Sequence, residues 1–239
     1  MPVYYYETSG FWTSILPIIL GMVICLIASW NVKSTFKRYS DVHNARGLTA
    51  AQAARQILDS NGLHHVPIER VSGNLTDHYD PRANVVRLSD SVYDSTSVAS
   101  LGVAAHECGH AVQHATSYAP IKVREAVLPL TNIGSNLWYI IFVVGLALSS
   151  SAFGAMLVWV GIILFALVVL FQIVTLPVEF NASRRALNTL ESYHMLEEGE
   201  LKQSAKVLRA AALTYVAAVA NALLQLFRLL AIAGNRRRR

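Results

Sequence analysis

The segment AAHECGHAVQHA, residues 104–115, places three histidines and a glutamate within nine residues of an otherwise apolar chain. His106, Glu107 and His110 form the pattern H-E-x-x-H. On a helix, His106 and His110 lie on one face and can bind one metal ion from adjacent turns. Zinc with an open position lowers the pKa of its water to about 7, and a neighbouring glutamate can take the proton. This is the chemistry of peptide-bond hydrolysis.

The same segment holds two further residues of ligand type. His114 stands about 12 Å along a helix from His106, too far to share one ion, so a role as a polar neighbour is expected. Cys108 falls on a different helical face and is expected to be a packed thiol, because a thiolate nucleophile would compete with the metal. Small residues surround the pattern and let another element approach closely: Ala104, Ala105, Gly109 and Ala111.

The composition indicates a membrane protein. Of the 239 residues, 54% are hydrophobic and only 15% are charged, well below the usual quarter in soluble proteins. The mean hydropathy is +0.39. The net charge of +5 would suggest nucleic acid in a soluble protein, but here basic residues flank apolar runs, which favours membrane topology and no nucleic acid. Two cysteines predict no disulfide framework.

Several uncharged or nearly uncharged runs are long enough to cross a bilayer. Residues 11–30 lack the basic start of a cleaved signal peptide and predict a transmembrane anchor. The runs at about 127–148 and 153–176 predict a transmembrane hairpin, 127–176. Residues 207–234 contain Arg209, Asn221, Gln225 and Arg228, and are expected either to span the membrane or to lie on it as an amphipathic helix.

Basic residues predict the orientation. Lys33, Lys37, Arg38 and Arg46 follow the anchor, and Arg184 and Arg185 follow the hairpin. Because positive flanks stay in the cytoplasm, the N-terminus should face outward. The active site is then expected on the cytoplasmic side of a multi-pass protein of the plasma membrane.

Residues 31–125 are the one stretch of soluble character and predict the first part of a metallopeptidase domain, with residues 177–206 as its second part. TAAQAARQILDSNGL predicts a helix, and HVPIERV, NLTDHYD and NVVRLS predict strands. Asp80-Pro81 marks a turn, so the last two strands should form a hairpin. The helix that carries the histidines follows, with Asp94 or Ser95 as its N-cap.

A third metal ligand must come from another segment. The candidates are Glu125, Glu179, Glu191 and His194. Glu179 follows Pro177, which suits the first turn of a new helix just inside the membrane. A glutamate in that position can also merely complement the helix dipole. Spacing alone leaves the choice open.

Three blocks in order resemble the YugP family of membrane zinc metallopeptidases: GNLTDHYDPRANVVRLSDSVY, GVAAHECGHAVQHA and LPVEFNASRRAL. That family is similar to the HtpX-type gluzincins, in which a membrane hairpin separates HExxH from an E-x-x-A-D block. The resemblance implies a mainly α membrane protein with three to four transmembrane helices and a small α+β, gluzincin-like cytoplasmic domain. It implies one zinc ion per chain, bound by His106, His110 and Glu179, with Glu107 as the general base.

Two residues depart from the family patterns. Ser183 stands where the HtpX-type block has Asp, and Asn181 stands where YugP-type relatives often have Asp. A carboxylate at this place would orient a zinc histidine. Asparagine can still accept a hydrogen bond from an imidazole N–H but brings no charge, so reduced metal affinity or activity is expected.

The expected substrates are membrane proteins, or their cytoplasmic tails and loops, because Glu179 follows a predicted span by about three residues. In gluzincins an edge strand before the active helix binds the substrate backbone, and NVVRLS is expected in that place. Asp77, His78 and Asp80 are of ligand type, although a turn is the commoner reading. The oxyanion stabiliser stays open among Arg184, Tyr193 and His194.

Two other functions compete with the enzyme. A zinc-stabilised membrane scaffold or partner-binding protein has no need of Glu107 as a base. A metal transporter predicts ionisable residues inside the spans, and residues 11–30 and 153–176 contain none. The small residues Gly145, Gly154 and Gly161 could let spans pack together, which leaves a homo-oligomer or a membrane-protein partner open.

Overall fold

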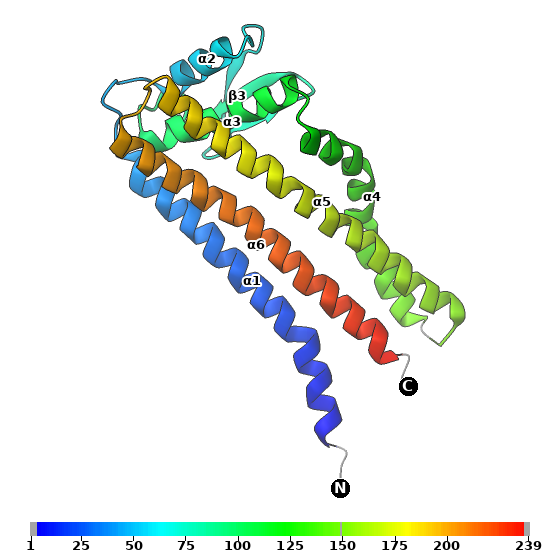
Figure 1. Ribbon diagram of the computed structural model, residues 1–239. Coiled ribbons are helices and arrows are strands. Elements are labelled where there is room, and N and C mark those ends of the chain that lie inside the picture. Colours follow the sequence, from blue (N-terminus) through cyan, green and yellow to red (C-terminus); the bar gives the residue numbers. More distant parts are fainter. Residues whose placement is uncertain (1–3, 149, 237–239) are drawn as a thin grey trace. The chain divides into compact units, whose positions relative to one another are not determined.

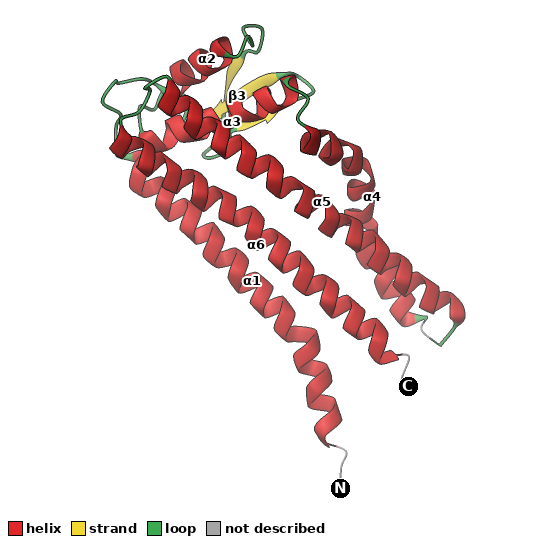
Figure 2. Ribbon diagram, in the orientation of Figure 1, coloured by secondary structure: helices red, strands yellow, loops and turns green. Residues whose placement is uncertain are grey.

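The computed structural model describes residues 4–148 and 150–236. Over these residues the chain is mainly helical and has one small sheet (Figures 1 and 2). The helices are α1 (Tyr4–Ser40), α2 (Ala50–Ser60), α3 (Val98–Ala115), α4 (Ala119–Ala147), α5 (Ala152–Ser192) and α6 (Glu198–Arg236). The strands are β1 (Ile68–Val71), β2 (His78–Asp80) and β3 (Val85–Ser89).

Four helices, α1, α4, α5 and α6, are long and apolar enough to cross a membrane. The apolar runs predicted from the sequence fall within these four helices, except that Leu148 lies one residue beyond the end of α4. Each helix continues beyond its apolar run, because backbone hydrogen bonding inside a helix does not require an apolar side chain. The candidate membrane-spanning helices therefore number four in the described part of the chain, including the one that contains Arg228.

Helix α5 runs through Pro177 without a break. The prediction that Glu179 opens a new helix was therefore wrong. A proline inside a helix removes one hydrogen bond, but Val178 and Ala182 on the following turns are completely buried and their packing offsets that loss. Glu179 lies in the middle of a helix, where its charge cannot complement the positive end of the helix dipole.

The chain divides into two compact units. Of the described residues, unit 1 comprises 4–28, 123–148, 150–175 and 215–236, and unit 2 comprises 29–122 and 176–214. The histidine helix α3, the sheet and Glu179 all belong to unit 2.

Unit 2 is built around the sheet and α3. Strand β3 lies between β1, which is parallel to it, and β2, which is antiparallel. The predicted hairpin of β2 and β3 is confirmed. The prediction that NVVRLS is an edge strand was wrong. These residues contain β3, which is the central strand because β1 pairs with one side of it and β2 with the other, so that β1 and β2 form the two edges. Val86 and Leu88 of β3 are buried in the same core as Leu101 and Ala105 of α3.

Side-chain caps fix the starts of two helices in unit 2. Thr49 and Gln52 form a capping box at α2, each side chain bonding the other residue's backbone N–H. At α3 the N-cap is Ser97, whose hydroxyl accepts a hydrogen bond from the N–H of Ser100. The predicted caps Asp94 and Ser95 were three and two residues too early. The hydroxyl of Ser95 bonds the hydroxyl and the backbone N–H of Ser97 instead of capping the helix.

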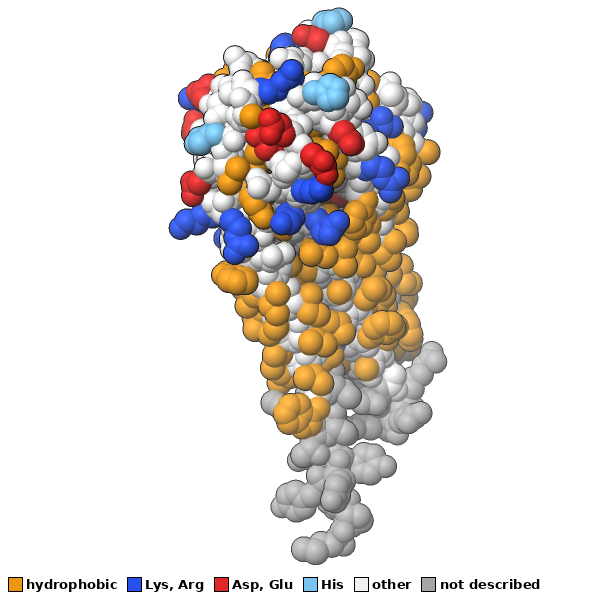
Figure 3. Space-filling model, turned by 60° about the vertical axis from the view of Figure 1, so that its left-hand side comes forward, with side chains coloured by type: hydrophobic (Ala, Val, Ile, Leu, Met, Phe, Trp, Pro, Cys, Tyr) orange, Lys and Arg blue, Asp and Glu red, His pale blue; other side chains and the backbone are white. Residues whose placement is uncertain are grey.

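Unit 1 consists of the apolar parts of the four long helices. Its core includes Phe142 from α4, Val158 and Phe165 from α5, and Leu229 from α6. Large hydrophobic side chains such as Ile133, Ile163 and Phe227 are exposed on its surface, and hydrophobic side chains dominate the visible face of this unit (Figure 3). A lipid environment removes the cost of exposing such side chains to water.

Glycines let α4 and α5 approach each other closely. A Cβ added to Gly161 of α5 would lie 2.9–3.0 Å from the Cβ and backbone of Phe142 of α4. A Cβ added to Gly145 of α4 would lie 2.6 Å from the backbone nitrogen of Val158. The α4–α5 hairpin therefore depends on small residues, as helix pairs in membranes commonly do.

We predict that Gly161→Ala destabilises unit 1, because the added methyl group forces α4 and α5 apart at a cost of roughly 1–3 kcal/mol. Thermal unfolding of the detergent-purified chain measures the effect. Gly234→Ala is the matched control, since a Cβ at Gly234 meets nothing within 4 Å. Equal unfolding temperatures for the two variants would contradict the close α4–α5 contact.

Candidate metal centre

Helix α3 brings two imidazoles together on one face. The Nε2 atoms of His106 and His110 lie 3.2 Å apart. Their rings meet edge to face, with an angle of 85° between the planes. Both side chains are largely buried, with 14% and 13% of their surface exposed. The i, i+4 spacing thus delivers the geometry that the H-E-x-x-H pattern predicts.

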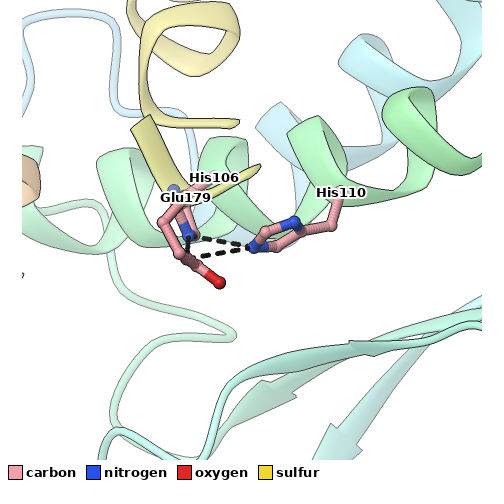
Figure 4. A group of neighbouring side chains, drawn as sticks. All are labelled: His106, His110 and Glu179. Carbon is pink, nitrogen blue, oxygen red and sulfur yellow. Dashed lines mark hydrogen bonds and ion pairs between the residues drawn. The ribbon is translucent and has the colours of Figure 1, made fainter. Parts of the chain in front are cut away.

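Helix α5 contributes the third group. The Oε2 atom of Glu179 lies 3.3 Å from Nε2 of His106 and 3.5 Å from Nε2 of His110. Figure 4 shows the three side chains converging from two helices. Among the described residues, this is the group of three His, Cys, Asp or Glu side chains close enough to hold one ion. The group does not include the alternative third ligands Glu125, Glu191 and His194.

A glycine permits this convergence. A Cβ added to Gly109 would lie 2.8 Å from the carbonyl oxygen of Ala182 and 3.2 Å from its Cα. The backbones of α3 and α5 therefore touch between the two histidines on one side and Glu179 on the other. A side chain at residue 109 would separate the helices that carry the three groups.

The distances fit a tetrahedral zinc ion. With zinc–ligand bonds of about 2.0–2.1 Å, two ligand atoms of a tetrahedron lie about 3.3–3.4 Å apart. The three observed separations range from 3.2 to 3.5 Å. The Oε2 atom of Glu179 is buried and makes no regular hydrogen bond. A buried carboxylate oxygen that faces two imidazole nitrogens fits a cation between the three atoms.

The other ring nitrogens are held by polar partners. The Nδ1 atom of His106 lies 3.1 Å from the Ser183 hydroxyl, and the Nδ1 atom of His110 lies 3.0 Å from Oε1 of Gln113. Because an amide oxygen can only accept, Nδ1 of His110 carries the proton and its Nε2 presents a lone pair. Both bonds orient an imidazole, and the bond to Gln113 also fixes the tautomer of His110.

Gln113 is completely buried and connects the two helices. Its Nε2 donates to the carbonyl oxygen of Val178 at 2.8 Å and to Oδ1 of Asn181 at 3.0 Å. Nε of Arg185 donates to the same Oδ1 at 2.9 Å. Asn181 therefore acts on His110 through Gln113, and the expectation that it bonds an imidazole directly was wrong. Ser183 makes the direct contact with His106 instead.

Sequence reasoning missed the role of Gln113. A signal was available, because Gln113 lies three residues after His110 and faces the same side of the helix. Its partners on α5 are 65 and 68 residues away in sequence, and no local pattern predicts that pairing.

Glu107 is fixed by the edge strand. Its Oε2 accepts a hydrogen bond of 2.9 Å from the backbone N–H of Tyr79. Tyr79 lies in β2, whose other side pairs with β3, so this N–H faces the free edge of the sheet. The carboxylate of Glu107 consequently lies beside both the histidines and the free edge of β2.

The remaining candidates have other positions. Cys108 is completely buried, and burial raises the pKa of its thiol far above the ordinary value, which leaves it protonated. Asp80 accepts hydrogen bonds from the backbone N–H groups of Arg82 and Ala83, as expected for a turn, and also pairs with Arg87. Asp77 accepts hydrogen bonds from Ser89 at the end of β3. Arg184, Tyr193 and His194 are exposed, and no hydrogen bond or ion pair recorded for the described residues joins them to the three-residue group.

The electrostatic field at the group favours positive charge. Burial lowers the pKa of His110, but the carboxylates of Glu179 and Glu107 and the bond to Gln113 together raise it above its ordinary value. The position therefore attracts a cation, either a proton or a metal ion.

Comparison with known proteins identifies relatives. Residues 14–234 match a family model described as "Putative neutral zinc metallopeptidase". The chain is 47% identical over 210 residues to the "Putative membrane protease YugP" of Bacillus subtilis (strain 168), an alignment that covers 88% of this chain and 92% of the relative. No solved structure matches the chain significantly.

We predict that Gly109→Ala lowers zinc binding, because its methyl group would press on the Ala182 backbone and widen the gap between Glu179 and the histidines. Overpacking of about 1–3 kcal/mol corresponds to roughly a five- to 150-fold loss of affinity. Competition with a zinc chelator measures it. Gly199→Ala serves as the control, since a Cβ there meets nothing within 4 Å. Unchanged zinc affinity in Gly109→Ala would contradict the proposed ligand geometry.

We also predict that Gln113→Leu weakens zinc binding by about 10–100-fold, because His110 loses the acceptor that fixes its tautomer. His114→Ala, four residues from His110 on the same helix, should leave zinc binding unchanged. Chelator competition on both variants compares the effect of losing the partner of His110 with the effect of losing His114. A larger loss of zinc affinity in His114→Ala than in Gln113→Leu would contradict the assignment of Gln113 as the residue that orients His110.

Proposed function

We propose that this chain, which belongs to the family of neutral zinc metallopeptidases, is a membrane-bound zinc endopeptidase that hydrolyses peptide bonds of membrane or membrane-proximal proteins. The observation that carries the proposal is the convergence of His106, His110 and Glu179 from two helices, with Glu107 beside them. The proposed ligands are these three side chains, and the proposed general base is Glu107.

A bound zinc ion would acidify a water molecule and polarise the peptide carbonyl. The chain's own residues supply the rest. His110 presents its Nε2 lone pair because its Nδ1 donates to the amide oxygen of Gln113, and the Ser183 hydroxyl holds the ring of His106 through Nδ1. Glu179 supplies the negative charge of the ligand set.

Glu107 moves the proton. The Tyr79 N–H holds Oε2 and leaves Oε1 to accept a proton from the attacking water as its oxygen bonds to the carbonyl carbon. When the C–N bond breaks, the same carboxyl group gives that proton to the leaving amine nitrogen. Placing one carboxylate to serve both steps contributes about 10²–10⁴-fold to the rate.

The outer edge of β2, on the side that does not pair with β3, is the proposed place for the substrate backbone. An extended peptide can pair with the exposed N–H and C=O groups of an edge strand, which requires no particular side chains. The edge passes Tyr79, whose N–H already touches Glu107. A peptide bound there would therefore present its backbone beside the proposed base, and β2 takes the role that the sequence assigned to NVVRLS.

Proximity to the membrane supports substrates that are themselves membrane proteins. Glu179 lies in α5, three residues beyond an apolar run that ends at about residue 176. Lys33, Lys37, Arg184 and Arg185 follow apolar runs, and the tendency of such residues to stay in the cytoplasm supports an active site on that side of the plasma membrane.

We predict that Glu107→Gln keeps zinc but loses about 10²–10⁴-fold in the rate of proteolysis, because glutamine cannot accept the proton. Cleavage of a model membrane substrate in proteoliposomes, together with zinc content, measures both. Glu191→Gln is the control, since it removes an exposed glutamate outside the group. Zinc-loaded wild type without turnover would favour the zinc-stabilised scaffold, and Glu107→Gln cleaving at the wild-type rate would overturn Glu107 as the general base.

A further inference from the structure

A second site lies in unit 2, away from the histidines in sequence. Helices α1 and α6 together line a cavity of about 360 Å³, and both helices can be followed in Figure 1. The polar side chains that line it are Asn31, Thr35, Arg38 and Tyr39 of α1 and Lys206 and Arg209 of α6. The proposed function assigns no role to any of them.

The cavity carries uncompensated positive charge. Arg38, Lys206 and Arg209 line it, and no Asp or Glu does. None of the ion pairs recorded for residues 4–148 and 150–236 includes any of these three. By contrast Lys202, one turn before Lys206, is paired with Glu198. Three cations around one cavity repel one another unless an anion is bound.

The lining suits an oxyanion with several acceptor oxygens. Guanidinium groups bind phosphate with two parallel N–H bonds, and an ammonium group adds a compact charge. Thr35 and Asn31 offer further donors from the same face of α1. The Nζ atom of Lys206 lies 5.9 Å from the centre of the Tyr39 ring, which holds the ammonium group at the cavity.

The site lies where both helices change from charged to uncharged sequence. On α1 no charged residue occurs between Glu7 and Lys33, so Asn31 directly follows the apolar run. On α6 no charged residue occurs between Arg209 and Arg228. Trp30, beside Asn31, is 72% exposed, as aromatic residues at the headgroup level of a bilayer often are.

The cavity also has an apolar end. Ala210 and Leu213 line it on the side where α6 becomes apolar, and Leu213 is exposed. A free phosphate ion makes no favourable contact with this apolar end, whereas the acyl chains of a phospholipid can pack against it. Basic pockets between transmembrane helices on the cytoplasmic side bind lipid headgroups elsewhere.

We propose that Arg38, Lys206 and Arg209 bind the phosphate of an anionic phospholipid, with the acyl chains along the apolar part of α6. The cavity would hold one lipid headgroup between α1 and α6. The proposal does not depend on proteolysis.

Native mass spectrometry of the zinc-loaded full chain in neutral detergent tests it, with phosphatidylglycerol, phosphatidylcholine and inorganic phosphate as probes. The variant is Arg38→Gln with Arg209→Gln. The control is Lys33→Gln with Lys37→Gln, which removes the same charge from exposed residues of α1 outside the cavity. Zinc content and elution volume in size exclusion show that each variant is folded.

The expected result is about a tenfold or greater loss of phosphatidylglycerol adducts in the cavity variant and less than about a twofold loss in the control, since two charge-assisted contacts are removed only from the former. Wild type should prefer phosphatidylglycerol over phosphatidylcholine, and millimolar phosphate should not displace it. Equal losses in the two variants would show diffuse attraction and overturn the site. Displacement by phosphate would make it a site for the free ion and overturn the lipid assignment.

Discussion

The contact between α3 and α5 at Gly109 is the constraint on which the proposed centre depends. Gly109 touches the backbone of Ala182, with no space for a methyl group. This contact brings three lone-pair atoms within 3.5 Å of one another in a largely buried place. Such an arrangement repels itself unless protons or a cation share the electron pairs. The packing of two helices therefore produces a position that is stabilised by bound positive charge, whether or not a substrate is present.

Neutral groups orient the two imidazoles. Metal-binding histidines often donate to carboxylates, but here a hydroxyl from Ser183 and an amide from Gln113 take that place. Two neutral imidazoles and one carboxylate would leave a divalent ion with a net positive charge. A further carboxylate beside each histidine would reduce that charge and with it the pull on a bound water's proton. The departures at residues 181 and 183 therefore do not remove the orientation of the histidines, since Gln113 and Ser183 provide it.

The sequence predicted the parts of this centre that depend on local spacing. H-E-x-x-H on a helix places His106 and His110 on one face whatever the rest of the chain does. The hairpin of β2 and β3 likewise followed from the Asp80-Pro81 turn. Spacing left Glu179 undecided because its partner helix is 69–73 residues away in sequence, and only the resemblance to a family favoured it.

The failures have a common cause. Pro177 suggested a helix start, yet burial of Val178 and Ala182 keeps α5 continuous. The edge position of β2 depends on β1, which pairs in parallel with β3 across a gap in the sequence. Gln113 finds its partners on another helix. In each case a long-range contact outweighs a local preference, and local patterns carry no information about such contacts.

The polar residues of α6 within unit 1 bear on whether that helix crosses the membrane. Nε of Arg228 donates to the backbone carbonyl of Ser14 at 2.6 Å. Pro17 has no N–H, so the helical bonding of α1 is disturbed one turn before it, beside Ser14. Asn221 packs directly on Gly21, where any side chain would collide with it. Both polar side chains contact α1, and such contacts lower the cost of placing them in a bilayer. The bond from Arg228 to a backbone carbonyl links α6 to α1. It supports α6 as a fourth membrane-spanning helix better than it supports an ion pathway.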